Sequence, residues 1–222
     1  MKPNGELFMK ILALEFSPPQ RSVAVVDGLA SFEVVEAAAR HTDALGMIGK
    51  VLLAAQLERE QIGCLAVGLG PGSYHGIRAA IALAQGWQLA NGVKLIGVTS
   101  AEAVAAQAQT EGFVGTASVV IDAQRNEFYV ARYAISPDGH RELVPLRIAT
   151  LAEVQAIEAT GEALLGPEVT RWLPSGKIVF PHATTLGKLA AHRSDFVTGE
   201  KLEPIYLRET AFVKAPPQRV IS

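Results

Sequence analysis

The chain has 222 residues and a net charge of −2, with 49% hydrophobic and 19% charged residues. This charge gives no support to nucleic-acid binding by the chain alone, and no segment has the continuous apolar length of a membrane span. The single cysteine, Cys64, cannot form a disulfide within the chain, which fits a reducing cytoplasm. We therefore expect a cytoplasmic globular protein with one large or two small domains.

Three strands and a helix are predicted in the first quarter of the chain. Residues 1–9 contain no apolar stretch with a cleavage site, and we read them as a loose leader. Runs of aliphatic and β-branched residues predict strands over 10–16, 22–27 and 32–38. Apolar residues such as Leu45 and Leu52 then recur at helical spacing, which predicts a helix over 42–57.

The remaining residues alternate between strands and helices, and their order repeats. Two strands are predicted first, with an apolar helix between them and a further helix starting at a Ser100 cap. These strands span 64–67 and 94–98, and the apolar helix spans 77–90. Three strands follow at 118–122, 127–133 and 143–148, then a helix at 151–159, short strands at Leu164 and Ile178, and a helix at 183–191. The repeated order predicts a duplicated α/β fold with subdomains over 10–110 and 111–222.

A glycine-rich turn precedes the apolar helix. Its residues are Gly70, Pro71, Gly72, Ser73 and Gly76. Glycines permit a sharp turn with positive φ, and a helix N-terminus presents unpaired N–H groups to an anion. The turn nevertheless matches none of the standard phosphate-binding or catalytic motifs. It lacks the lysine of a P-loop, and its spacing is that of neither a Rossmann fingerprint nor a nucleophile elbow.

The helix over 77–90 has almost no polar face. Only Arg78, Gln85 and Gln88 are strongly polar within it. A surface helix normally shows a polar face, so this one is expected to be buried on more than one side. Two readings stay open: other elements of the chain cover the helix, or one face docks on a partner together with the preceding helix. Arg78 is unfavourable to the helix dipole, so we expect it to have a carboxylate partner, either within the chain or across an interface.

Several segments resemble one protein family. They are Ile11-Leu-Ala-Leu-Glu-Phe-Ser17, Ser22-Val-Ala-Val, Gly70-Pro-Gly-Ser-Tyr-His-Gly-Ile-Arg78, Ile96-Gly-Val-Thr-Ser100, Ile121-Asp-Ala-Gln-Arg-Asn-Glu-Phe-Tyr129 and Glu203-Pro-Ile-Tyr-Leu-Arg208. In this order they are similar to the TsaB (YeaZ-like) family, glycoprotease-like proteins of tRNA threonylcarbamoyladenosine biosynthesis. The resemblance covers nearly the whole chain, and the segment with the glycine turn is its most specific part.

The resemblance implies an actin-like, acetate-kinase-like fold of two ribonuclease-H-like subdomains and a non-catalytic role, so no catalytic residue is assigned. TsaB-like proteins bind the transferase TsaD through helices of the first subdomain, the ATPase TsaE completes the system, and contact with tRNA is only indirect. Without its partner the chain is expected to form a homodimer through the same surface. The implied interface residues are Leu45, Ile48, Leu52, Arg78, Ala80, Ile81, Ala84 and Trp87.

The sequence departs from the family where a nucleotide would bind. Many relatives have Asp-Thr-Ser after the first strand, whereas this chain has Glu-Phe-Ser-Pro-Pro over 15–19. The acid is longer, Phe16 lacks a hydroxyl, and the prolines donate no hydrogen bonds. No cofactor is therefore assigned, although weak ATP or ADP binding between the subdomains, near Asp122 and Arg125, stays open.

A metal site is not expected either. Catalytic relatives hold a metal with two histidines four residues apart, but here Leu45 follows His41 at that spacing. Tyr74 and His75 stand where relatives often have Phe-Thr, and the sequence does not explain this change. Two alternative functions stay open: an enzyme of the same fold (a peptidase or a small-molecule kinase) and a self-associating structural module.

Overall fold

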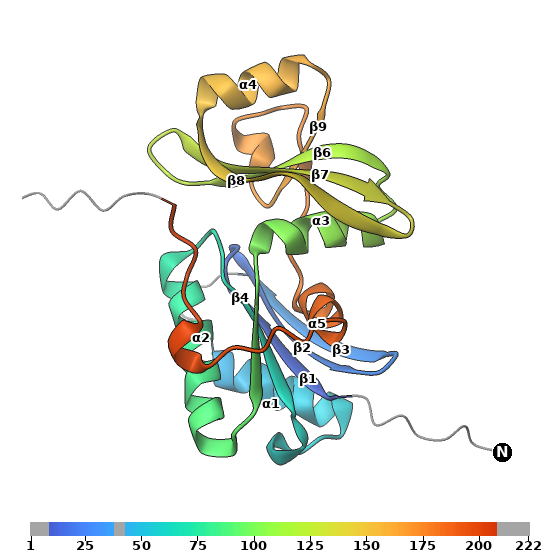
Figure 1. The fold of residues 1–222 in the computed structure, drawn as a ribbon, viewed down its shortest axis with the longest axis vertical. Helices are drawn as coiled ribbons and strands as arrows, with labels where there is room; N and C mark the ends of the chain where they lie inside the picture. Colours follow the sequence, from blue (N-terminus) through green and yellow to red (C-terminus); the bar gives the residue numbers. More distant parts are fainter. Residues whose placement is uncertain (1–8, 38–42, 208–222) are drawn as a thin grey trace, which may run out of the picture.

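The computed structural model describes residues 9–37 and 43–207, which form two five-stranded sheets (Figure 1). The first sheet has the strand order β3-β2-β1-β4-β5. Its strands are β1 (Ile11–Glu15), β2 (Gln20–Asp27), β3 (Ala30–Ala37), β4 (Cys64–Gly68) and β5 (Lys94–Val98). Strands β1, β2 and β3 are antiparallel neighbours, whereas β4 and β5 run parallel to β1.

The second sheet repeats this arrangement with the order β8-β7-β6-β9-β10. Its strands are β6 (Gly115–Asp122), β7 (Glu127–Ser136), β8 (Gly139–Thr150), β9 (Ala163–Gly166) and β10 (Lys177–Ile178). Antiparallel pairing again joins the first three strands, and the last two run parallel to β6 and to each other. The predicted duplication is therefore confirmed, and β6 is the counterpart of β1.

Helices cover the outer face of each sheet unequally. On the first sheet, α1 (Ala44–Ala55) packs on β2 and β3, and α2 (Tyr74–Asn91) packs on β1, β4 and β5. On the second sheet, α4 (Leu151–Ala159) packs on β7 and β8, and the counterpart of α2 is only the short turn η2 (Val169–Arg171). Two further 3₁₀ turns are η1 (Arg59–Gln61) and η3 (Gly199–Lys201).

Two helices lie between the sheets, and each packs on the sheet that it does not directly follow in the chain (Figure 1). Helix α3 (Ser100–Thr110) follows the first sheet but places Ala101, Val104 and Ala108 in the core of the second. Helix α5 (Ala183–Ala191) follows the second sheet but packs Leu186 and Ala190 into the core of the first. A single boundary after residue 110 therefore does not describe the packing of the chain.

The helix starts differ slightly from the predicted ones. Helix α2 begins at Tyr74, because the Ser73 hydroxyl accepts a hydrogen bond from the Gly76 N–H at 3.3 Å and caps the helix. Helix α3 is capped by Thr99, whose hydroxyl accepts from the Glu102 N–H at 3.0 Å. Ser100, the predicted cap, is instead the first helical residue.

A C-terminal strap, residues 196–207, covers one flank of α2. Its backbone at Val197 pairs with Leu95 at the edge of the first sheet, and Leu202 is buried in that sheet's core. Gln85 donates to the Gly199 carbonyl at 2.8 Å, and Gln88 accepts from the Gly199 N–H at 2.7 Å. Two of the three polar residues of the apolar helix thus bind the strap, which the sequence did not predict.

Candidate interface and interdomain cleft

Helices α1 and α2 leave an apolar surface open on the first half of the molecule. Leu45 and Leu53 on α1 are 61% and 80% exposed, and Leu89 on α2 is 89% exposed. Between the helices lies a groove of about 400 Å³, whose lining includes Leu83 and Trp87. We call the exposed residues Leu45, Gly49, Leu53, Ala82, Gly86 and Leu89, together with Trp87, the helix face.

Two glycines of the helix face serve no packing need within the chain. A Cβ atom added to Gly49 or Gly86 would meet nothing within 4 Å. Glycine in a helix interior costs about 1 kcal/mol relative to alanine, and neither position has the positive φ that would call for glycine. These glycines instead lower the surface, which allows another helix to approach closely.

The structure corrects five of the eight predicted interface residues. Ile48, Leu52, Ala80, Ile81 and Ala84 are between 0% and 5% exposed and belong to the core of the first sheet. They pack in the core of the first sheet, although Ile48 also lines the groove between the two helices. The helical repeat predicted an apolar stripe correctly but did not tell which side of each helix the sheet occupies.

The other three predicted residues reach the surface. Leu45 is exposed, and Trp87 lines the groove while packing partly on the core. Arg78 is exposed and donates to the hydroxyl of Tyr74 at 3.0 Å, with its guanidinium 5.2 Å from the centre of that ring. Among the described residues, Arg78 therefore pairs with a tyrosine, and a carboxylate partner across an interface stays a prediction.

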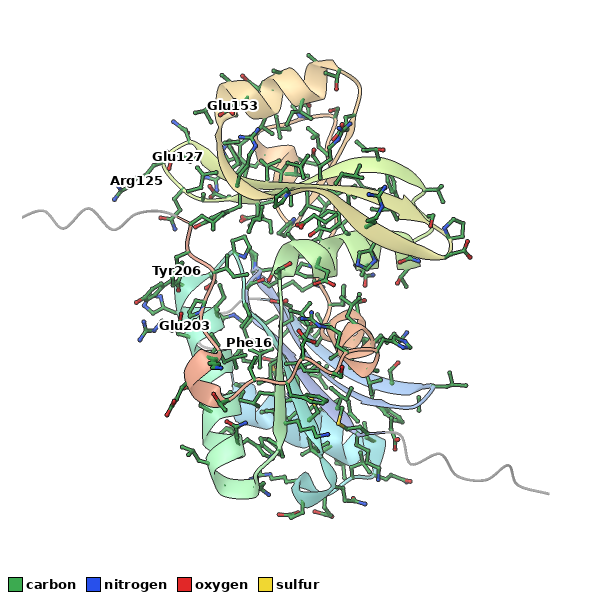
Figure 2. The ribbon with its side chains drawn as sticks, viewed as in Figure 1. Phe16, Arg125, Glu127, Glu153, Glu203 and Tyr206 are labelled. Atoms are coloured by element: carbon green, nitrogen blue, oxygen red, sulfur yellow. The ribbon has the colours of Figure 1, made fainter. Side chains whose placement is uncertain are left out.

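The contacts of Tyr74 partly explain the unusual pair Tyr74 and His75. Its ring stacks on Tyr206 of the strap, with ring centres 5.4 Å apart and planes at 29°, and His75 meets it edge-on at the same separation. In Figure 2, Tyr206 and Glu203 mark the strap as it runs along α2 toward the second sheet. Sequence reasoning missed Tyr206, because no local pattern links it to a residue so far away in the chain.

The glycine turn packs directly against the end of β1. The Ser73 N–H donates to the Ser17 carbonyl at 2.7 Å. A Cβ on Gly72 would overlap the backbone of Ser17, and one on Gly76 would overlap the carbonyl of Phe16. Gly72 also has φ of +150°, so these glycines are required by close backbone approach rather than by a bound phosphate.

A cleft of about 300 Å³ opens between the two halves. Proline supplies much of its wall, and proline has no N–H to donate. Arg21, Asp122 and Glu168 are the charged residues in the lining, so carboxylates outnumber cations there. The lining prolines are Pro18, Pro19, Pro71, Pro167 and Pro181. This chemistry fits a polyphosphate poorly, because phosphate needs N–H donors and positive charge.

The loop after β6 forms part of the rim of this cleft. Asp122 and Gln124 line the cleft, and the Asp122 carboxylate accepts from the Gln124 N–H at 2.7 Å. Gln124, Arg125 and Asn126 have φ of 64°, 58° and 60°, a run of left-handed non-glycine residues that is costly for the backbone. Arg125 is exposed on this loop, beside Glu127 in Figure 2.

Glu15, at the position expected for the acidic residue of a nucleotide site, lies under the cleft rather than in it. Its side chain is fully buried, and burial raises its pKa to about 7. The carboxyl group accepts from the Ser17 N–H at 2.8 Å and contacts the Ser100 hydroxyl at 3.3 Å. Phe16 is also fully buried, so neither side chain is placed to meet a ligand.

Residues 9–37 and 43–207 contain neither a candidate metal site nor a helix that could span a membrane. No group of three or more histidine, cysteine, aspartate or glutamate side chains is placed there to hold a metal ion. Within the same residues, no helix is both long and apolar enough to cross a membrane. His41, most of the predicted leader (1–8) and Arg208 lie outside the described residues.

Two sheets of identical strand order, with an exchanged pair of inner helices and a cleft between them, define a duplicated actin-like α/β protein. Residues 35–207 match the family model described as TsaD, tRNA N6-adenosine threonylcarbamoyltransferase. This match covers most of the chain. The chain therefore belongs to the TsaD family and, within it, to the TsaB (YeaZ-like) proteins.

The relatives support this assignment over nearly full length. The tRNA threonylcarbamoyladenosine biosynthesis protein TsaB of Escherichia coli is 28% identical over 228 residues, spanning 94% of this chain and 99% of that protein. The TsaB protein of Haemophilus influenzae is 29% identical, spanning 95% and 98%. A Pseudomonas aeruginosa structure described as similar to peptidase YEAZ has a TM-score of 0.80 at 25% identity, covering 90% of this chain and 100% of that chain.

Proposed function

We propose that this chain is a non-catalytic accessory subunit in the threonylcarbamoyladenosine modification of tRNA, and that it binds a TsaD-type transferase through the helix face. The observation that carries the proposal is the exposed apolar surface of α1 and α2. Exposed leucines around a groove are unfavourable in water, and such surfaces mark protein interaction sites.

The side chains of the helix face suit contact with a pair of partner helices. Gly49 and Gly86 let a partner backbone approach, and Trp87 offers the kind of large aromatic side chain that often dominates binding energy. Because the TsaB and TsaD proteins share one family model, a TsaD-type partner would present two helices of similar arrangement. In its absence, a second copy of this chain would cover the same surface.

The cleft supports a role without catalysis. Glu15 is buried beneath it, prolines form much of its wall, and its carboxylates disfavour phosphate. A TsaE-type ATPase would then supply nucleotide chemistry to the complex, and tRNA would contact mainly the transferase. Such a complex would work in the cytoplasm, where tRNA is modified.

Transfer of threonylcarbamoyl to tRNA tests the role directly. TsaD-type and TsaE-type proteins from the same organism are assayed with and without this chain, and we expect activity to require it. Full activity without the chain would reject the accessory role. Activity of the chain alone would instead favour the enzyme alternative.

Association tests the surface separately. Leu45→Glu and Leu89→Glu place carboxylates on the helix face, and each is expected to weaken binding to the transferase at least about tenfold, because burial of one leucine is worth about 1.5–3 kcal/mol. The matched control is Ala156→Glu on the exposed side of α4 in the second half. Equal binding by all three variants, measured by isothermal titration, would place the interface elsewhere.

A further inference from the structure

The chain passes between the two halves of the molecule at two places within the described residues. The first crossing lies between the end of β5 and the start of α3, at 98–100. The second lies between β10 and α5, at 178–183. Any change in the angle between the halves must bend the backbone at these crossings, so the contacts made there are placed to affect the width of the cleft.

The first crossing is held by a buried carboxyl group of the first sheet. Ser100 lies 2.7 Å from the Ser17 hydroxyl and 3.3 Å from the Glu15 carboxyl group, oxygen to oxygen. Its N–H donates to the Gly70 carbonyl at 2.8 Å. The start of α3 is thereby tied to the end of β1 and to the glycine turn at once.

The second crossing is held by another carboxylate of the same sheet. Glu33, on β3, lies 3.1 Å from the His182 ring nitrogen Nδ1 and accepts from the Thr184 N–H at 3.0 Å. Ser22, on β2, accepts from the Ala183 N–H at 2.8 Å. Helix α5 has no side-chain cap of its own, so these two side chains satisfy its first N–H groups from the sheet below.

We propose that Glu15 and Glu33 set the angle between the two halves, and with it the width of the cleft, by fastening the two crossings to the first sheet. Both are positioning residues, since neither lines the cleft. This inference concerns the chain itself and does not depend on the proposed partner.

The charges around the two carboxyl groups make this arrangement sensitive to pH. Burial raises the pKa of Glu15 to about 7, and the contact with Glu33 raises the pKa of His182. The charged groups facing this region are His182, Glu15, Glu33 and Glu111, the last paired with Lys177 at 3.0 Å. Raising the pH ionises Glu15, and its burial disfavours the charged carboxylate. Raising the pH also discharges His182, which weakens its attraction to Glu33. Both changes favour a more open arrangement, so we expect the two crossings to loosen as the pH rises.

The test measures the distance between the halves in the full chain. Spin labels are attached at Glu60→Cys in the first half and Asp138→Cys in the second, both exposed. The native thiol of Cys64 is buried with its pKa raised to about 12, so it does not react at the labelling pH. We expect one narrow distance distribution at pH 5.5 and a broader one, with a longer second distance, at pH 8.5.

Two variants separate the roles of the carboxyl groups. Glu33→Gln is expected to raise the ratio of open to closed molecules about tenfold at pH 5.5, the change that corresponds to losing a hydrogen bond to a charged group. Glu15→Gln cannot ionise, so it should stay closer to the closed distance than the parent chain at pH 8.5. The control, Glu36→Gln, removes a half-buried carboxylate on β3 that pairs with Lys50 at 3.2 Å and lies at neither crossing.

Three outcomes would overturn the proposal: a Glu33→Gln distribution equal to that of the control, a Glu15→Gln variant that opens at pH 8.5 as the parent does, or no opening of the parent chain. Circular dichroism checks the fold of each variant. If Glu33→Gln does not fold, Ser100→Ala replaces it, because this change removes only the hydroxyl between Glu15 and Ser17. An unchanged distance distribution in Ser100→Ala at pH 5.5 would likewise reject the proposal.

Discussion

The two halves share one strand order but use it differently. The outer face of the first sheet carries two helices of 12 and 18 residues and the strap, whereas the second carries one helix of 9 residues and a 3-residue turn. The longer helices do more than cover their sheet, since their far sides expose apolar residues to water. The two halves therefore share one frame, and the longer helices give one of them an exposed apolar surface, on which we propose that a partner docks.

The equivalent strand ends show the same divergence at one residue. Glu15 ends β1 and Asp122 ends β6, and each accepts a hydrogen bond from the N–H two residues later, at 2.8 Å and 2.7 Å. The longer Glu15 side chain is buried under Ser100, whereas Asp122 opens onto the cleft. One acidic position has become part of the core, and the other has stayed at a surface.

We expect the largest effect on stability from a substitution on the buried side of α2. Ala84→Glu would bury a carboxylate without a partner, at a cost of more than about 4 kcal/mol, so we expect a chain that does not fold. Circular dichroism and solubility measure this. Ala82→Glu, on the exposed side of the same helix, should fold normally. A native-like Ala84→Glu variant would contradict the packing of α2 on the first sheet.

The strap, which has no counterpart on the second half among the described residues, provides the next test. Leu202→Ala removes a buried side chain that joins the strap to the core, and we expect the free energy of unfolding to fall by about 2–4 kcal/mol. Urea unfolding gives this value. Leu207→Ala, near the exposed end of the strap, is the control and should change stability by less than about 0.5 kcal/mol. Equal effects would mean that the strap does not stabilise the first half.

Burial of Glu15 at the end of β1 predicts that the stability of the folded chain depends on pH. The pKa of Glu15 is raised from 4.5 to about 7, so the folded state holds a proton that the unfolded chain releases, and stability falls as the pH rises through this interval. We expect Glu15→Gln to remove about 1–3 kcal/mol of the loss seen between pH 5 and pH 7.5 in urea unfolding. A Glu15→Gln profile parallel to the parent's would show that this group does not titrate as inferred.

We expect the smallest effect at Gly86, a glycine of the helix face that neither close packing nor a positive φ requires. Gly86→Ala adds a Cβ in open space and favours the helix, so we expect about 0.5–1 kcal/mol of added stability in thermal unfolding. Its counterpart on the same helix, Gly76→Ala, would collide with the Phe16 carbonyl and should destabilise the chain. If Gly86→Ala gains stability and loses affinity for the transferase, the glycine serves docking.

Local sequence patterns determined most of the architecture. Runs of aliphatic and β-branched residues placed the strands, and apolar residues at helical spacing placed the helices. The repeated order of these elements predicted the duplicated fold that the sheets confirm. The glycine turn was also readable as a turn before a helix, but its close approach to Ser17 and Phe16, far away along the chain, was not. These signals succeed because backbone geometry couples residues only a few positions apart.

Only the tertiary structure decided which residues of α1 and α2 are exposed and which contacts join distant parts of the chain. The repeats in α1 and α2 could not distinguish the buried Ala84 from the exposed Leu89, because a helical period shows that an apolar side exists but not what covers it. Likewise, Glu33 meets His182 across 149 positions of sequence. Contacts of that kind depend on how finished elements pack, and no local pattern along the chain encodes them.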